Sequence, residues 1–300
     1  MKNSATIWHI LAVITVTFWG TSYVSTKVLL EHGFTSVQVF FIRFIFTYLL
    51  LLLACHRKLW AQSAKDELIL FVSGIAGGTL YFWTQNVALS LSPSSNVSLI
   101  VCTNPLLILI FGSILYKSER LCKRQVLGTL LTFVGMVLVV LNGKFVLKLS
   151  PLGDFLALVA GIFWAVYSLS LRLLNGRYSN LFITRKIFFY SLVSSIPLVA
   201  VEYLNGHTIP WANFAEPVVT LNFLCLSVFS SLFGYLVWNK VLDKIGTVLA
   251  SNYIYAIPLV TIITALVTIG ERITPMAWAG AAAIVSGMVV AEYKNRNRKK

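Results

Sequence analysis

Long apolar runs, separated by short polar stretches, follow one another along almost the whole chain. A helix needs about 20 apolar residues to cross the hydrocarbon core of a bilayer. Runs of this kind lie at 7–29, 35–55, 68–90, 94–116, 124–142, 153–172, 182–204, 217–240, 247–269 and 274–292. The pattern predicts an all-α membrane protein with ten transmembrane helices and no room for a soluble domain.

The composition agrees with a membrane protein. Of the 300 residues, 58% are hydrophobic and 11% are charged, whereas about 25% of the residues in a soluble domain are charged. The net charge of +14 does not predict nucleic-acid binding, because the basic residues lie between apolar runs, where they face anionic lipid. The four cysteines show no CxxC spacing, so we expect no disulfide framework, metal site or cofactor.

The basic residues also predict the topology. With the N-terminus in the cytoplasm, 17 Lys and Arg residues fall in inner segments and four in outer segments. Inner loops are the ones that collect Lys and Arg, so both termini are predicted to be cytoplasmic. The first run is longer than a signal-peptide core and lacks a clean cleavage site, so we interpret it as a membrane helix.

Two distant stretches are nearly the same: "NPLLILIFGSILYKSER" at 104–120 and "IPLVTIITALVTIGER" at 257–272. The matching positions are Pro105 and Pro258, Glu119 and Glu271, Gly128 and Gly280, and Gly135 and Gly287. We therefore predict one five-helix repeat at 1–148, a second at 149–293, and a basic tail at 294–300. Five is odd, so the repeats must be inverted, which is typical of secondary transporters that work by alternating access.

The matched residues have more than one interpretation. Pro105 and Pro258 are predicted to kink their helices near the midplane and so to mark a binding site, although prolines can also shape packing. The two glutamates are predicted to accept hydrogen bonds from the start of the following helix. The glycines let helices approach closely, either as a packing seam within each half or as a dimer contact.

The ten spans, the repeated "P…ER…G…GMV" and the "FWGTSY" at 18–23 resemble the drug/metabolite transporter superfamily, and within it the bacterial EamA-type permeases. The resemblance covers essentially the whole chain. It implies an exporter or exchanger of small polar metabolites, such as amino acids, in the bacterial inner membrane. It also implies a central cavity lined by the third, fourth, eighth and ninth helices, with the first and sixth beside them.

Polar and aromatic side chains in the middle of the spans are the candidates for substrate binding. A mid-membrane indole that faced lipid would leave its N–H without a partner, so a cavity or a helix interface must receive it. The alternative role is hydrogen bonding between helices. The candidates are Trp19, Tyr81, Gln85, Asn104, Trp164, Tyr167, Tyr235, Trp238, Asn252 and Tyr255.

Three basic residues lie within apolar runs. Arg43 is predicted to bind a substrate carboxylate, or alternatively to stabilise a helix end. Arg185 and Lys186 are expected to extend toward the inner surface. The sequence has no Asp or Glu at the middle of a span, which favours facilitated diffusion or exchange over a carboxylate proton relay.

The alternatives belong to other classes. No catalytic motif is present, so we do not expect an enzyme. The expected partners are a small solute and the lipid bilayer, without nucleic acid, and the protein is expected to be a monomer or homodimer. An importer of another metabolite, such as a nucleotide-like cofactor, stays open because sequence does not set direction, as does a channel or non-transporting membrane protein.

Overall fold

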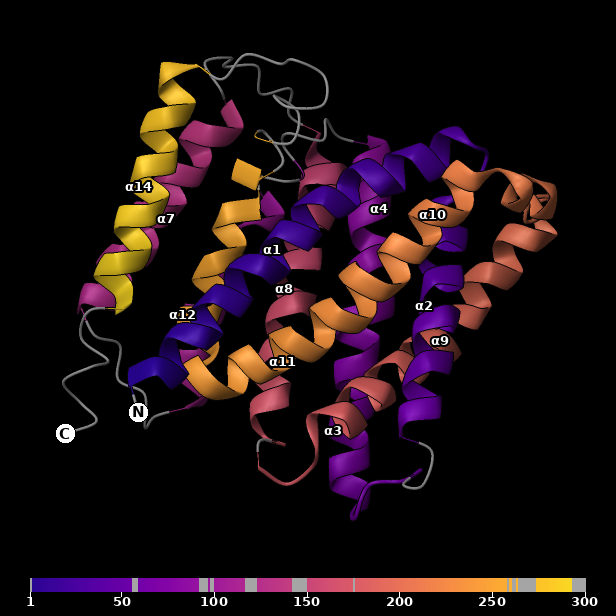
Figure 1. Cartoon of the computed structure of the whole chain (residues 1–300), viewed down its shortest axis with the longest axis horizontal. Helices are drawn as coiled ribbons and strands as arrows, with labels where there is room; N and C mark the ends of the chain where they lie inside the picture. The colour runs from indigo at the N-terminus through magenta and orange to yellow at the C-terminus, as the bar shows by residue number, and fades with distance from the viewer. Residues whose placement is uncertain are drawn as a thin grey trace.

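The computed structural model describes residues 2–55, 59–91, 97, 100–116, 123–141, 150–174, 176–257, 259–260, 263 and 274–292. These residues form helices joined by short turns and contain no β-strand (Figure 1). The all-helical prediction is therefore confirmed for this part of the chain. The elements are α1 (Lys2–Glu31), α2 (Ser36–Ala54), α3 (Ala64–Gly74), η1 (Ile75–Leu80), α4 (Tyr81–Leu91), α6 (Asn104–Leu115), α7 (Lys123–Leu141), α8 (Pro151–Arg172), α9 (Asn180–Leu204), η2 (Trp211–Ala215), α10 (Pro217–Cys225), η3 (Leu226–Phe233), α11 (Gly234–Ile245), α12 (Thr247–Asn252), η4 (Tyr253–Ala256) and α14 (Pro275–Glu292).

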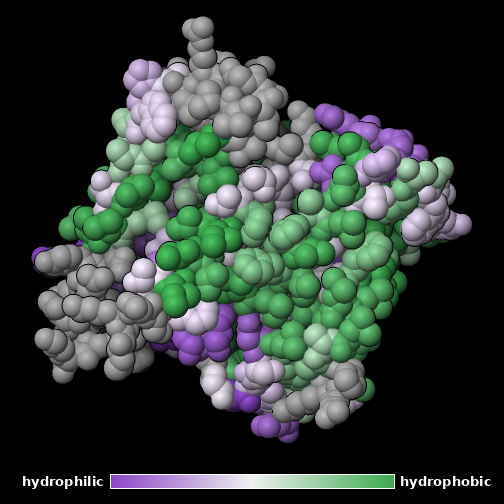
Figure 2. Space-filling view, viewed as in Figure 1, coloured by the Kyte–Doolittle hydropathy of each residue, from purple (hydrophilic) through white to green (hydrophobic). Residues whose placement is uncertain are grey.

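Several of these helices suit a bilayer. By length and composition, five helical stretches of the described chain can cross a membrane: Ser36–Ala54, Ala64–Ala88, Pro151–Arg172, Asn180–Leu204 and Pro217–Ile245. Large apolar side chains on their outer faces are exposed, and Leu53 (77%) and Leu204 (83%) are extreme cases. Figure 2 shows apolar side chains across the middle of one face, with hydrophilic ones gathered toward its upper right and lower edges. Hydrocarbon is the solvent that such a surface fits.

Two of the long helices contain a π-helical segment. The segment η1 joins α3 to α4, and η3 joins α10 to α11, without a break in the helix. A π-turn widens the helix and disturbs the regular ladder of backbone hydrogen bonds, so its carbonyl groups become available to other donors. Such segments are often found at functional sites.

Helices that are distant in sequence pack against one another. The first long helix, α1, packs on α11, while α8 packs on α4. The other contacts join α2 to α9, α6 to α12, and α7 to α14. In Figure 1, α7 and α14 lie side by side at the left, and α2 and α9 lie at the right. Elements before and after residue 150 are therefore interleaved, and the main core contains side chains from both parts.

The predicted glycines form the seam between α7 and α14. A Cβ atom at Gly135 would lie 2.6 Å from the backbone nitrogen of Ile284, and one at Gly128 would lie 2.6 Å from the carbonyl oxygen of Gly287. The reverse contacts hold for Gly280 and Gly287. The seam thus joins the two predicted halves and does not lie within either one, because each helix uses its glycine face to approach the backbone of the other.

Pro105 lies in the first turn of α6, after a turn at Cys102 and Thr103. Helical residues lie on both sides of this turn, so the helical stretch is interrupted next to Pro105, and the assignment of this proline to a binding site stays a prediction. Proline suits this position because the first backbone N–H groups of a helix have no intrahelical acceptor. Pro258, Glu119 and Glu271 lie outside the described residues.

We predict that Gly135→Ala lowers the free energy of unfolding by about 1–3 kcal/mol, because the added Cβ would overpack the α7–α14 seam. The matched control is Gly112→Ala, where a Cβ would lie 3.5 Å from Leu169 Cδ2, in ordinary contact. Thermal unfolding in detergent micelles measures both variants. Equal melting temperatures for the two variants would contradict the prediction.

Candidate solute-binding site

Six of the predicted aromatic residues meet in the centre of the bundle. Trp164 from α8 is the hub: its ring centroid lies 5.0 Å from that of Tyr81, 5.1 Å from Tyr167 and 5.5 Å from Trp19. On the far side of Trp19, the ring of Trp238 lies 5.0 Å away. We call this group the aromatic cluster; its members are Trp19, Tyr81, Trp164, Tyr167, Tyr235 and Trp238.

Part of the cluster is held by hydrogen bonds. The Tyr167 hydroxyl donates to Asn239 Oδ1 at 2.5 Å, and Asn239 Nδ2 donates to Thr184 Oγ1 at 3.0 Å. The other two fixed donors reach the π-helical segments. Trp19 Nε1 donates to the carbonyl oxygen of Ser230 in η3 at 3.0 Å, and the Tyr235 hydroxyl donates to that of Gly77 in η1 at 2.9 Å. The available carbonyl groups of the π-turns thus fix the orientation of these rings.

Other polar atoms at the cluster are buried without a hydrogen-bond partner among the described residues. They are Trp164 Nε1, Trp238 Nε1, Ser168 Oγ, Gln85 Oε1 and Asn104 Oδ1. A Cβ on Gly161 would lie 3.0 Å from Asn104 Oδ1, so this oxygen lies one helical turn from Trp164. Leaving a buried polar atom without a partner costs about 1–3 kcal/mol. The set contains both donors and acceptors, as a zwitterionic or amphipathic solute requires.

Arg43 brings a positive charge to the edge of the cluster. Its side chain is 7% exposed, and its guanidinium carbon lies 4.3 Å from the ring centroid of Phe82 and 5.3 Å from that of Phe44. The ring of Phe44 in turn lies 6.3 Å from that of Tyr235. A guanidinium is planar and presents its N–H groups in one plane, which suits a bidentate carboxylate.

The η1 segment supplies functional positions that the sequence analysis missed. A Cβ on Gly77 would meet the ring of Tyr167 at 2.4 Å, and one on Gly78 would meet Ser191 Oγ at 2.0 Å. The glycines therefore let α8 and α9 approach the helix at the level of the cluster. The signal was present as three glycines in "GIAGG", 74–78, within an otherwise bulky span, because clustered small residues mark close contacts between membrane helices.

Asn252 and Tyr255 do not join the aromatic cluster. Thr129 of α7 donates to Asn252 Oδ1 at 3.1 Å, and the ring of Tyr255 faces Phe133 of α7 at 6.1 Å. Asn252 also lines a small pocket with His9, Leu249, Tyr253 and Met288. These two residues therefore belong to the contact between α12, η4 and α7.

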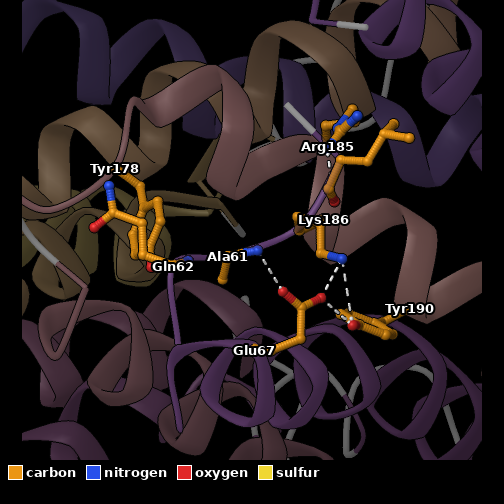
Figure 3. Close-up of polar contacts among 8 residues, drawn as sticks. Ala61, Gln62, Glu67, Tyr178, Arg185, Lys186 and Tyr190 are labelled. Atoms are coloured by element: carbon orange, nitrogen blue, oxygen red, sulfur yellow. Dashed lines mark hydrogen bonds and ion pairs between the residues drawn. The ribbon is translucent and has the colours of Figure 1, made fainter. Parts of the chain in front are cut away.

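A polar cluster joins the start of α3 to the start of α9 (Figure 3). Lys186 pairs with the Glu67 carboxylate, which also accepts hydrogen bonds from the Tyr190 hydroxyl and, at 2.7 Å, from the Ala61 backbone. The neighbouring Arg185 donates to the carbonyl oxygen of Cys55 at 3.0 Å. Arg185 and Lys186 are each 2% exposed as whole residues. The expectation that they extend to the surface is therefore wrong: Lys186 pairs with a carboxylate and Arg185 donates to backbone carbonyl groups inside the bundle.

A second charged group lies next to this pair. Arg177 Nη1 lies 2.6 Å from Asp66 Oδ1, and the Tyr178 hydroxyl donates to Asp66 Oδ2 at 2.9 Å. Burial, together with this hydrogen bond to a carboxylate, raises the pKa of Tyr178. We call the residues Asp66, Glu67, Arg177, Tyr178, Lys186 and Tyr190 the α3–α9 latch.

Comparison with known proteins supports a transport role. A "Probable amino-acid metabolite efflux pump" of Escherichia coli is 24% identical, over 97% of this chain and 96% of its own. An "Uncharacterized transporter" of Archaeoglobus fulgidus is 28% identical, over 97% of this chain and 99% of its own. A "Probable terminal-alkyne amino-acid exporter" of Streptantibioticus cattleyicolor is 21% identical, over 100% of this chain and 97% of its own.

The fold also has a solved counterpart. A crystal structure of a protein with 21% sequence identity superposes with a TM-score of 0.76 and covers 99% of each chain. The sequence profile of the EamA-like transporter family matches this chain twice, at residues 6–141 and at 151–292. These matches span nearly the whole sequence, and the chain therefore belongs to the EamA-like transporter family.

Proposed function

We propose that this protein is a secondary transporter that carries a small amphipathic solute, such as an amino acid, by alternating access. The observation that carries the proposal is the aromatic cluster, together with buried polar atoms such as Trp164 Nε1 and Asn104 Oδ1 that have no partner among the described residues. A solute that filled these atoms' hydrogen-bonding capacity would recover the free energy that their burial costs. Two of the similar proteins bear names that refer to amino-acid export or efflux, which favours this class of solute.

We further propose ten membrane helices in two inverted repeats, 1–148 and 149–293, followed by the tail at 294–300. The packing supports this arrangement. The contact between α1 and α11 has its counterpart in the contact between α8 and α4. Each of the other pairs, α2–α9, α6–α12 and α7–α14, joins equivalent helices of the two proposed repeats. The π-helical segments also occupy equivalent helices. Such reciprocity is expected around a two-fold axis in the membrane plane.

The proposed orientation has both termini in the cytoplasm of a bacterial cell, with the protein in the inner membrane. It rests on the distribution of Lys and Arg. In this orientation the α3–α9 latch lies at the cytoplasmic end. Export or exchange is the proposed direction, and import is the alternative that a direct flux measurement would identify.

The solute should carry a carboxylate. Arg43 brings a guanidinium to the edge of the aromatic cluster, where it lies over the rings of Phe82 and Phe44. Two of the segments that contribute to the site, Tyr81–Leu91 and Asn104–Leu115, contain no Asp or Glu. A carboxylate on the solute would therefore pair with Arg43, while neutral acceptors such as Asn104 Oδ1 would receive an ammonium or hydroxyl group.

The melting temperatures of two variants distinguish a binding role for Asn104 from a structural one. We predict that Asn104→Leu leaves the melting temperature unchanged or raises it, because an unsatisfied oxygen is replaced by an apolar group of similar size. Asn239→Leu is the contrasting variant, since it removes two buried hydrogen bonds and should cost about 2 kcal/mol or more. The melting temperatures of the two variants are compared in the same detergent. A greater decrease for Asn104→Leu than for Asn239→Leu would show that Asn104 has a structural role in helix packing.

Transport is tested by counterflow in proteoliposomes. Vesicles loaded with an amino-acid mixture should accumulate one labelled amino acid from outside. Trp164→Ala and Arg43→Gln should each lower the initial rate by about tenfold or more, which corresponds to about 1.4 kcal/mol. Trp278→Ala is the matched control, because Trp278 is 57% exposed on α14.

Each result of the counterflow experiment has a definite meaning. Stimulated uptake that depends on Trp164 and Arg43 supports a carrier with this site. Equal uptake by all variants would retain the carrier and refute the site. Flux that rises without saturation and ignores the internal solute would indicate a channel, and the absence of amino-acid uptake would refute this solute class.

A further inference from the structure

We infer that the α3–α9 latch is the tighter of two gates, so that the solute-free protein opens first at the opposite end of the bundle. This inference rests on the proposed alternating access. The latch lies at the start of α9, where Glu67 of α3 meets Lys186, and a second set of contacts lies at the end of α9, where Thr35 meets Glu202. The ion pairs at the two ends, Lys186–Glu67 and His32–Glu216, differ in burial and in the number of hydrogen-bond donors to each carboxylate.

The latch end is a buried network. The side chain of Lys186 is 3% exposed and that of Glu67 19%, and the lysine ammonium lies 4.6 Å from the ring centroids of both Trp60 and Tyr190. The Glu67 carboxylate has three donors, as Figure 3 shows. Separating α3 from α9 would strand this charge pair in a poorly solvated interface, and a buried charge that loses its partner is strongly unfavourable.

The ion pair at the opposite end is more exposed. His32 Nε2 lies 3.4 Å from Glu216 Oε2, with side chains that are 30% and 54% exposed. Gln38 Nε2 donates to the carbonyl oxygen of His207 at 2.9 Å, and Asn213 Nδ2 donates to that of His32 at 2.8 Å. We call these residues, together with Thr35 and Glu202, the α2–α9 bridge.

The difference in burial between the two ion pairs determines which end of the bundle opens first. Water replaces an exposed hydrogen bond or ion pair at little net cost, because the groups are already partly hydrated. The His32–Glu216 pair can therefore separate into water, while the Lys186–Glu67 pair must first admit water into an interface between aromatic rings. In the proposed orientation, the empty carrier opens toward the outside and stays closed toward the cytoplasm.

Distances between spin labels measure each end separately. The chain is made cysteine-free by replacing Cys55, Cys102, Cys122 and Cys225, and is studied without solute in nanodiscs by double electron–electron resonance. Labels at Gln62 and Leu173 report the latch end, and labels at Glu31 and Asn205 report the bridge end; all four positions are exposed. We expect a single short distance at the latch end, and both short and long distances at the bridge end.

Three variants identify the latch as the cause. Glu67→Gln should raise the long-distance population at the latch end by about tenfold or more, because it leaves Lys186 without a counter-charge. Adding Lys186→Met should restore the short distance, since an uncharged pair in the same interface has no such penalty. Glu216→Gln, which weakens the bridge, should leave the latch end unchanged.

Two results would overturn the inference. One is a long-distance population at the latch end of the wild type that equals or exceeds that at the bridge end. The other is a double variant that stays as open as Glu67→Gln, which would point to general damage. Failure of the proposed function is a separate result: counterflow would show no exchange, although the two ends could still differ as expected.

Discussion

Every polar group in the bundle must find its partner within the protein, because the surrounding hydrocarbon offers none. This constraint shapes both π-helical segments. The carbonyl groups of Gly77 in η1 and Ser230 in η3 accept hydrogen bonds from Tyr235 and Trp19, which belong to other helices. An interruption that would be unfavourable in an isolated membrane helix is thereby stabilised by its neighbours. The same bonds orient the rings that form the centre of the site.

The same constraint makes buried polar atoms without a described partner informative. Trp164 Nε1 and Asn104 Oδ1 are buried with no partner in the part of the chain that the structure describes, although the nearby Tyr167 hydroxyl is satisfied. A protein selected for stability alone would have replaced such groups, since their burial is unfavourable. Several such atoms lie at the aromatic cluster, as a site for a polar solute requires, and others, such as Asn252 Nδ2, lie at the contact with α7.

Much of this arrangement could be predicted from the sequence, and the remainder shows where sequence patterns lose information. Length and hydropathy predicted the helical fold. The expectation that tryptophan avoids mid-membrane positions selected Trp19 and Trp164 as candidates, and the structure brings their rings to 5.5 Å from each other. The residue pattern did not reveal that Asn252 faces α7, because a helix of uniform hydropathy does not indicate which side meets a neighbour. It also did not reveal that Lys186 pairs with Glu67, because that contact joins residues 119 positions apart.

The glycine seam between α7 and α14 restricts how the two halves can diverge in sequence. A side chain introduced at Gly135 meets the backbone of α14, and one introduced at Gly280 meets that of α7. Neither copy can accept a larger residue there unless the other retreats, so a single substitution cannot be compensated by another side chain. Residues such as Trp164, which contact side chains from several helices, have no such reciprocal restriction. After a duplication, the seam would therefore keep the two copies alike while the solute site between them was free to become asymmetric.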